Sequence, residues 1–203
     1  MTLEDPILTR GSLLLRIRSH EDQAAWSEFV EIYLPLIYAY ARKQGLQDAD
    51  ASDVAQDVLT SINGAISRFD YDPKQGKFRG YLFTVTRNQI GKSWKKKVGS
   101  AGSGNTAVHQ MLEQVADPAG DPADDEEHWN QQHQQRLMQW ASEKVQAEVT
   151  PATWQAFELT SIANQKAQTV AETLGLSVGA VYIAKSRVIK RIRELIQSIE
   201  PDE

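Results

Sequence analysis

The chain has 203 residues, with 22 Lys and Arg against 27 Asp and Glu, and a formal net charge of -5. It contains no cysteine, which excludes disulfides and thiolate metal sites and suits a reducing cytoplasm. No apolar run approaches the roughly 20 residues of a membrane span, and the first residues lack a signal-peptide pattern, so we expect no membrane contact and a cytoplasmic location. The length and the 41% hydrophobic residues allow two small cores.

The first half of the chain carries apolar residues at helical spacing. One such pattern starts near Ser12, passes a capping-box pattern at Ser19 and Asp22, and continues to Tyr40 with a kink expected at Pro35. A second follows the expected stop at Gly45, with Val54, Val58, Leu59, Ile62 and Ile66 facing inward. Asp53, Gln56 and Asp57 share the opposite face of this second helix. They are either a solvated acidic surface near a helix N-terminus or a surface on which a partner docks, and composition does not decide between these alternatives.

A basic segment follows. Between Pro73 and Lys97 there is no Asp or Glu, and the basic residues are Lys74, Lys77, Arg79, Arg87, Lys92, Lys95, Lys96 and Lys97. Aromatic residues accompany them: Phe69, Tyr71, Phe78, Tyr81, Phe83 and Trp94. We expect a loop over 69–80 and a helix over about 81–97. Because exposed rings stack on unpaired bases while cations follow phosphates, the segment predicts contact with opened DNA. The alternatives are that part of the aromatic set is core and that the lysines are a solvated helix end.

The charge pattern then reverses. From Val98 to Gln135 there are acidic residues and no Lys or Arg, and residues up to Asp125 are rich in Gly, Ala, Ser, Asp and Pro. This composition predicts a flexible acidic linker. Helices should resume near Glu126, run to about Val149, and restart after Thr150 and Pro151, which are typical of a helix N-cap and first turn.

The segment from Ala167 to Arg193 has the spacing of a helix-turn-helix. Gly175 can supply a positive φ in a tight turn, and Ser177 can cap the second helix. Residues at three- and four-residue steps predict one buried stripe: Val181, Ala184, Val188, Ile192 and Leu195. Gly179, Ile183, Ser186, Arg187 and Lys190 lie opposite, with Tyr182 at the margin, which predicts a major-groove face. The alternative is a helical hairpin with solvated cations.

Catalytic and metal-binding patterns are missing from the sequence. There is no Cys nucleophile, GxSxG, Walker loop or HExxH, and His128 and His133 are five residues apart, on different faces of a helix. No long strand-like alternation occurs. We therefore expect an all-α protein that is no enzyme and that uses no metal or cofactor.

Three segments together resemble bacterial RNA polymerase sigma factors of the extracytoplasmic-function class: DASDVAQDVLTSI, FRGYLFTVTRNQIGKSWKKK and the helix-turn-helix. The resemblance implies two helical domains, a region-two-like domain over 1–97 and a region-four-like domain over 126–203, joined by the acidic linker at 98–125. It implies transcription initiation at specific promoters. The implied partners are core RNA polymerase and promoter DNA, with an anti-sigma protein as a further possible partner, and we expect a monomer.

The family's functional positions carry over onto three sets of residues. Asp53, Gln56 and Asp57 would bind core polymerase. The minus-ten element would be contacted by Phe69, Lys77, Arg79, Arg87, Asn88, Lys92, Trp94, Lys95 and Lys96. The minus-thirty-five element would be contacted by Ser177, Gly179, Tyr182, Ile183, Ser186, Arg187 and Lys190. The acidic run from Asp117 to Glu127 would, by analogy, imitate RNA.

One departure from the family bears on specificity. Family members commonly place Glu, Lys and Arg where this chain has Val178, Tyr182 and Ala184, so the resemblance does not define the bases that are read. Two other classes stay open on the residues alone. A stand-alone helix-turn-helix regulator would bind duplex sites by itself, usually as a dimer, and a recombinase would need a catalytic Ser or Tyr among clustered arginines.

Overall fold

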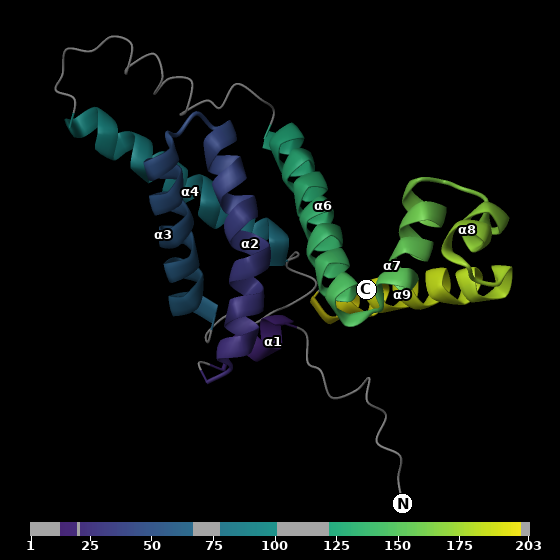
Figure 1. The fold of residues 1–203 in the computed structure, drawn as a ribbon. Coiled ribbons are helices and arrows are strands. Elements are labelled where there is room, and N and C mark those ends of the chain that lie inside the picture. Colours follow the sequence, from purple (N-terminus) through teal and green to yellow (C-terminus); the bar gives the residue numbers. More distant parts are fainter. Residues whose placement is uncertain (1–12, 20, 67–77, 101–121, 200–203) are drawn as a thin grey trace, which may run out of the picture. The chain divides into compact units, whose positions relative to one another are not determined.

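The computed structural model describes residues 13–19, 21–66, 78–100 and 122–199, and every regular element in these ranges is a helix (Figure 1). The expected all-α class is confirmed for this part of the chain. The helices are α1 (Leu13–Ile17), α2 (Gln23–Lys43), α3 (Asp48–Ile66), α4 (Phe78–Ser100), α6 (Pro122–Glu148), α7 (Pro151–Phe157), a π-helix η2 (Glu158–Ile162), α8 (Ala167–Leu174) and α9 (Val178–Ile199).

The chain divides into two compact units. One comprises Ile17–Arg136, and the other comprises Leu137–Glu203 together with Met1–Arg16. The division falls inside α6, so this helix contributes to both units, whereas the sequence predicted a boundary at 125/126. α4 continues to Ser100 and α6 begins at Pro122, so both helices extend into the range 98–125 that was predicted as the linker. Residues 101–121 lie outside the described part of the chain.

The first unit is built on α2 and α3, which are joined by a short turn and pack along each other, with α4 crossing behind them (Figure 1). The Asp22 carboxylate caps α2 by accepting from the Ala25 N–H at 2.8 Å. Gly45, with φ 85°, follows the end of α2, as predicted. α2 passes through Pro35 without a break. α4 starts at Phe78, three residues before the expected start, so the end of the predicted loop is helical.

Aromatic rings fill one end of this core. Phe29 lies 4.4 Å from Tyr33 and 5.9 Å from Phe78, measured between ring centroids. All three side chains are at least 97% buried. Phe78 is the first residue of α4, so this ring fixes the start of that helix to the middle of α2.

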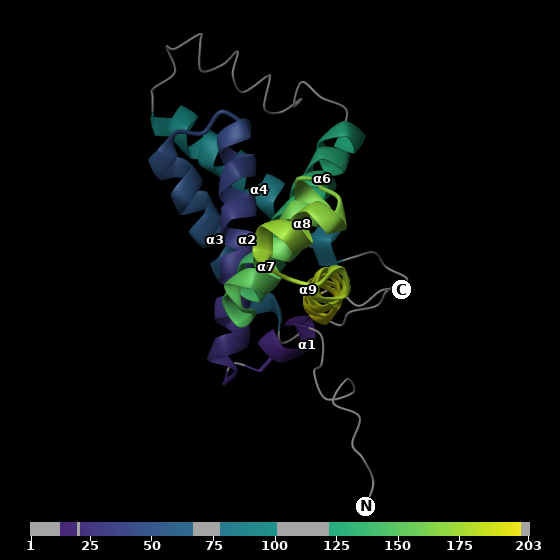
Figure 2. The ribbon, with the colours of Figure 1, turned by 45° about the vertical axis from the view of Figure 1, so that its right-hand side comes forward.

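The second unit places α7 and α8 on one side of the long helix α9 (Figures 1 and 2). The Thr150 hydroxyl accepts from the Thr153 N–H, and Pro151 opens the first turn of α7, as the sequence predicts. Its core contains Ala156, Val170, Ala171, Val181 and Ala184. Small residues predominate here, which lets the three helices approach closely. The π-helix after α7 was not predicted.

Candidate nucleic-acid interface

The helix-turn-helix forms as its sequence predicts. α8 ends at Leu174 and is followed by the C-cap Gly175, which has φ 64°, and the Leu176 N–H donates to the Ala171 carbonyl at 2.9 Å. The Ser177 hydroxyl then accepts from the Ala180 N–H at 3.1 Å. The turn therefore satisfies backbone groups at the end of α8 and the start of α9.

The two faces of α9 also follow the predicted register. All five predicted stripe residues are at most 9% exposed: Val181, Ala184, Val188, Ile192 and Leu195. All seven residues assigned to the minus-thirty-five surface are exposed: Ser177, Gly179, Tyr182, Ile183, Ser186, Arg187 and Lys190. Helical periodicity alone was sufficient for this result, because α9 packs on one side only.

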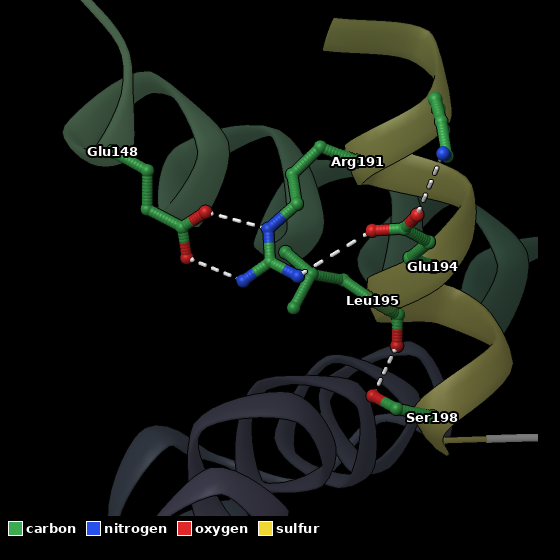
Figure 3. A network of polar contacts seen from close by, with 6 residues as sticks. Glu148, Arg191, Glu194, Leu195 and Ser198 are labelled. Carbon is green, nitrogen blue, oxygen red and sulfur yellow. Dashed lines mark hydrogen bonds and ion pairs between the residues drawn. The ribbon is translucent and has the colours of Figure 1, made fainter. Parts of the chain in front are cut away.

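Polar contacts separate the cations of α9 into two kinds (Figure 3). Arg191 binds Glu148 with two hydrogen bonds, of 2.6 and 3.0 Å, and its pKa is raised, first by these bonds. Lys190 approaches Glu194 only to 3.8 Å, and its side chain is 78% exposed. Such an exposed pair is weak, so Lys190 can turn toward a phosphate at little cost. Arg191 instead joins α9 to the end of α6.

The basic helix α4 exposes a polar stripe. Asn88, Lys92, Lys95 and Lys96 are exposed, and the first three follow one another at steps of four and three residues, on one face of the helix. Arg79 and Arg87 are half-buried, and the Arg87 guanidinium lies 5.6 Å from the centroid of the Phe83 ring. The structure thus brings six of the nine predicted minus-ten residues onto one helix with their polar ends accessible or partly so.

The aromatic part of the same prediction is corrected. Trp94 is only 8% exposed, so its ring is part of the core and presents little surface to a phosphate backbone. Lys97 sits 5.6 Å from the centroid of that ring and pairs with Asp50 at the start of α3. Phe78 and Phe83 are at most 5% exposed. Two other predicted residues, Phe69 and Lys77, lie outside the described residues.

The first half of α6 covers part of α4 and was not foreseen as part of the first unit. Trp129 is 1% exposed, with its ring 5.4 Å from Tyr40 and 5.6 Å from Phe83. One turn earlier, the Asp125 carboxylate accepts from Tyr40 at 3.1 Å and from Gln44 at 3.2 Å. This acidic residue, assigned to the linker by composition, therefore anchors a packed helix.

A buried histidine continues the same contact. His133, 0% exposed, stacks on Tyr33 at 5.5 Å, and its Nε2 lies 3.4 Å from the Tyr33 hydroxyl. Burial, together with the charge of Arg79, lowers the pKa of His133 to about 3. Asp125, Trp129, His133 and Arg136 recur at four, four and three residues, and this spacing was the signal in the sequence for an inward face.

The predicted core-polymerase surface is accessible. Asp53, Gln56 and Asp57 are exposed, whereas Val54, Val58, Ile62 and Ile66 are at most 2% exposed on the other side of α3. The fold provides no core role for these three side chains. Their shared face is therefore available to a partner.

The described residues offer neither a metal site nor a membrane-spanning helix. Among them, no three His, Cys, Asp or Glu side chains are grouped so that they could hold a metal ion. Within the same ranges, no helix has both the length and the apolarity to cross a membrane.

Comparisons with known proteins agree with the first unit. Residues 29–98 match the Sigma-70 region 2 family. The chain is 30% identical over 78 residues to the ECF RNA polymerase sigma factor RpoE of Cereibacter sphaeroides, over 38% of this chain and 42% of that protein. The match thus spans less than half of the relative's length. A likeness to the structure of CnrH in complex with the cytosolic domain of CnrY covers 91% of this chain and 95% of that one, at 20% identity and a TM-score of 0.36.

Proposed function

We propose that this chain, whose residues 29–98 match the Sigma-70 region 2 family, is a sigma factor that binds core RNA polymerase and directs it to particular promoters as a subunit of the extracytoplasmic-function type. One observation carries the proposal: a region 2 domain and a helix-turn-helix with an uncovered outer face occur in one chain, in separate compact units. Two such surfaces can bind double-stranded and single-stranded promoter DNA at the same time. Neither needs to break a covalent bond.

The first unit would attach to polymerase through α3. Asp53, Gln56 and Asp57 stand on an exposed face, at the positions where the family's polymerase-binding helix carries acidic and amide residues. A compact acidic face suits a basic partner surface, and charge complementarity favours fast and specific association.

The same unit would hold the minus-ten element with α4. Asn88 offers an amide to a base edge, and Lys92 and Lys95 extend from the same face toward phosphates. Because Phe78, Phe83 and Trp94 of α4 are buried and Tyr81 is half-buried, stacking on parted bases would depend mainly on Phe69, which precedes α4 in sequence. Stacking contributes roughly 1–3 kcal/mol per base, comparable with the few kcal/mol that flipping one base costs.

The second unit would hold the minus-thirty-five element in duplex form. The N-terminal end of α9 would enter the major groove, with Arg187 and Lys190 about two and a half to three turns after its first residue, Val178. The net charge of -5 fits this division of labour, since weak binding by the chain alone leaves promoter occupancy to the assembled polymerase. We infer that the protein is a cytoplasmic monomer. An anti-sigma protein is a further candidate partner.

Run-off transcription on a library of random promoters tests the proposal directly. Purified core polymerase is assayed alone, with the chain, and with the triple variant Asp53→Ala, Gln56→Ala, Asp57→Ala. We expect transcripts that share a sequence motif only with the unaltered chain, because the variant should fold but not associate with polymerase. Equal transcription without the chain, or tight and specific duplex binding by the chain alone, would refute the proposal and favour a stand-alone regulator.

A further inference from the structure

The first two turns of α9 combine exposure with a lack of charge. From Val178 to Ala184 there is no charged side chain, yet Val178, Tyr182 and Ile183 are 40%, 61% and 63% exposed. Most large apolar side chains are covered in folded proteins, and clusters of exposed ones mark binding surfaces. These three lie away from the buried stripe, so packing within the unit does not explain them.

We propose that this apolar face, defined as Val178, Tyr182 and Ile183, reads thymine methyl groups in the major groove of the minus-thirty-five element. The inference rests on the proposed function, and it names the bases that the second unit recognises. The N-terminal residues of a recognition helix are those that reach base edges. Among the groups displayed in the major groove, the thymine methyl is the apolar one, so it is the partner for an apolar side chain.

Gly179 supports a close approach on this face. It is exposed within a helix, where glycine weakens the structure relative to alanine. A Cβ placed there would meet only the Ser177 hydroxyl oxygen, at 3.9 Å. The fold therefore does not require glycine at this position. A missing side chain beside Tyr182 and Ile183 instead leaves room for the helix backbone to come near base edges.

The surroundings indicate a polyanion as the occupant. From Thr173 to Arg193 the chain has five basic residues and no acidic residue. An open hollow of about 310 Å³ adjoins the apolar face, and Tyr182 lines it together with Lys166 and Lys185, without any carboxylate. A phosphate backbone fits beside such a hollow while the groove floor meets Ile183. A purely apolar protein partner would gain nothing from these cations.

Removal of the methyl group alone tests the inference. Holoenzyme containing the full chain is bound to its selected promoter and to copies in which deoxyuridine replaces each thymine of the upstream element. We expect affinity to fall about fourfold for each contacted methyl, which is the contribution of one buried methyl group. Ile183→Ala should abolish the loss at one position, because the side chain that meets that methyl is gone.

Matched variants separate readout from folding. Met138→Ala removes another exposed apolar side chain of the same unit, 51% exposed on α6, and should keep full sensitivity to deoxyuridine. Gly179→Ala should preserve or raise the unfolding temperature while weakening promoter binding. A fall in stability together with binding would overturn the role given to Gly179.

Three further results would overturn the inference as a whole. Deoxyuridine could be harmless to the unaltered holoenzyme, the selected element could lack thymine, or Ile183→Ala could spare DNA binding and abolish binding of an anti-sigma protein. In each case transcription that depends on the chain would leave the proposed function intact. Loss of that dependence would instead refute the proposed function itself.

Discussion

The helices α4 and α9 carry similar basic charge but opposite surfaces. α4 buries its rings at Phe78, Phe83 and Trp94 and exposes amide and ammonium groups, whereas α9 exposes Tyr182 and Ile183 and buries a plain aliphatic stripe. The difference lies in their neighbours. α4 is contacted by α2 and α3 and is further covered by Trp129, whereas α9 packs on α7 and α8 along one side. Charge therefore predicts where a helix meets solvent, but not what its aromatic residues do.

The largest expected effect on stability comes from removing Trp129, the α6 side chain that covers part of α4. Trp129→Ala should lower the free energy of unfolding by about 3–5 kcal/mol, because it leaves a cavity between Tyr40 and Phe83. Urea unfolding followed by circular dichroism measures the change. Gln134→Ala, at an exposed position of the same helix, should stay within about 0.5 kcal/mol. If both variants are equally stable, α6 does not cover α4 in solution.

Low pH should destabilise the packing of α6 on the first unit, because His133 of α6 is buried against Tyr33. The pKa of His133 is about 3 in the folded chain and 6.5 in the unfolded one, so the unfolded chain binds more protons between these values. The contribution of neutral His133 is thus fully present above pH 6.5 and is lost as pH falls toward 3, by a few kcal/mol in total. Stability measured across this range should show the slope. His133→Leu should flatten it, and His128→Gln should not.

The two helices should also differ in how they respond to loss of a cation. Arg187→Ala on α9 should weaken promoter binding by holoenzyme by about 1–3 kcal/mol if the guanidinium contacts a guanine in the groove. Lys95→Ala on α4 should weaken binding uniformly across sequences and reduce the salt slope by about one. Affinities at several salt concentrations give both results. Unchanged affinity for Arg187→Ala at every salt concentration would contradict the groove assignment.

The smallest expected effect on stability comes from breaking the contact between Arg191 of α9 and Glu148 of α6. Arg191 holds Glu148 with two hydrogen bonds, but Glu148 is exposed, so Glu148→Ala should reduce stability by about 1 kcal/mol or less. Promoter affinity should be unaffected, in contrast to Arg187→Ala. A loss of DNA binding in this variant would mean that the orientation of α9 depends on α6.

Local chemistry was sufficient for the features that depend on one helix and its ends. The Gly175 turn, the Ser177 cap, the two faces of α9 and the inward face of α3 follow from spacing and from backbone hydrogen bonding, which act over a few residues. The accessibility of Asp53, Gln56 and Asp57 follows in the same way. Each of these features could therefore be predicted from the sequence.

Tertiary packing decided what depends on residues far apart in the chain. Trp94 and Phe83 lie in a cationic segment whose composition predicts contact with DNA. Their rings are nevertheless buried, because α2, α3 and α6 supply apolar surface on several sides of α4. Asp125 was assigned to the linker from the acidic composition around it. Composition does not reveal that Tyr40 and Gln44, more than 80 residues earlier in the chain, donate hydrogen bonds to its carboxylate. Periodicity sets which residues share a face, but only the fold determines which faces are covered, because burial depends on the partner that arrives there.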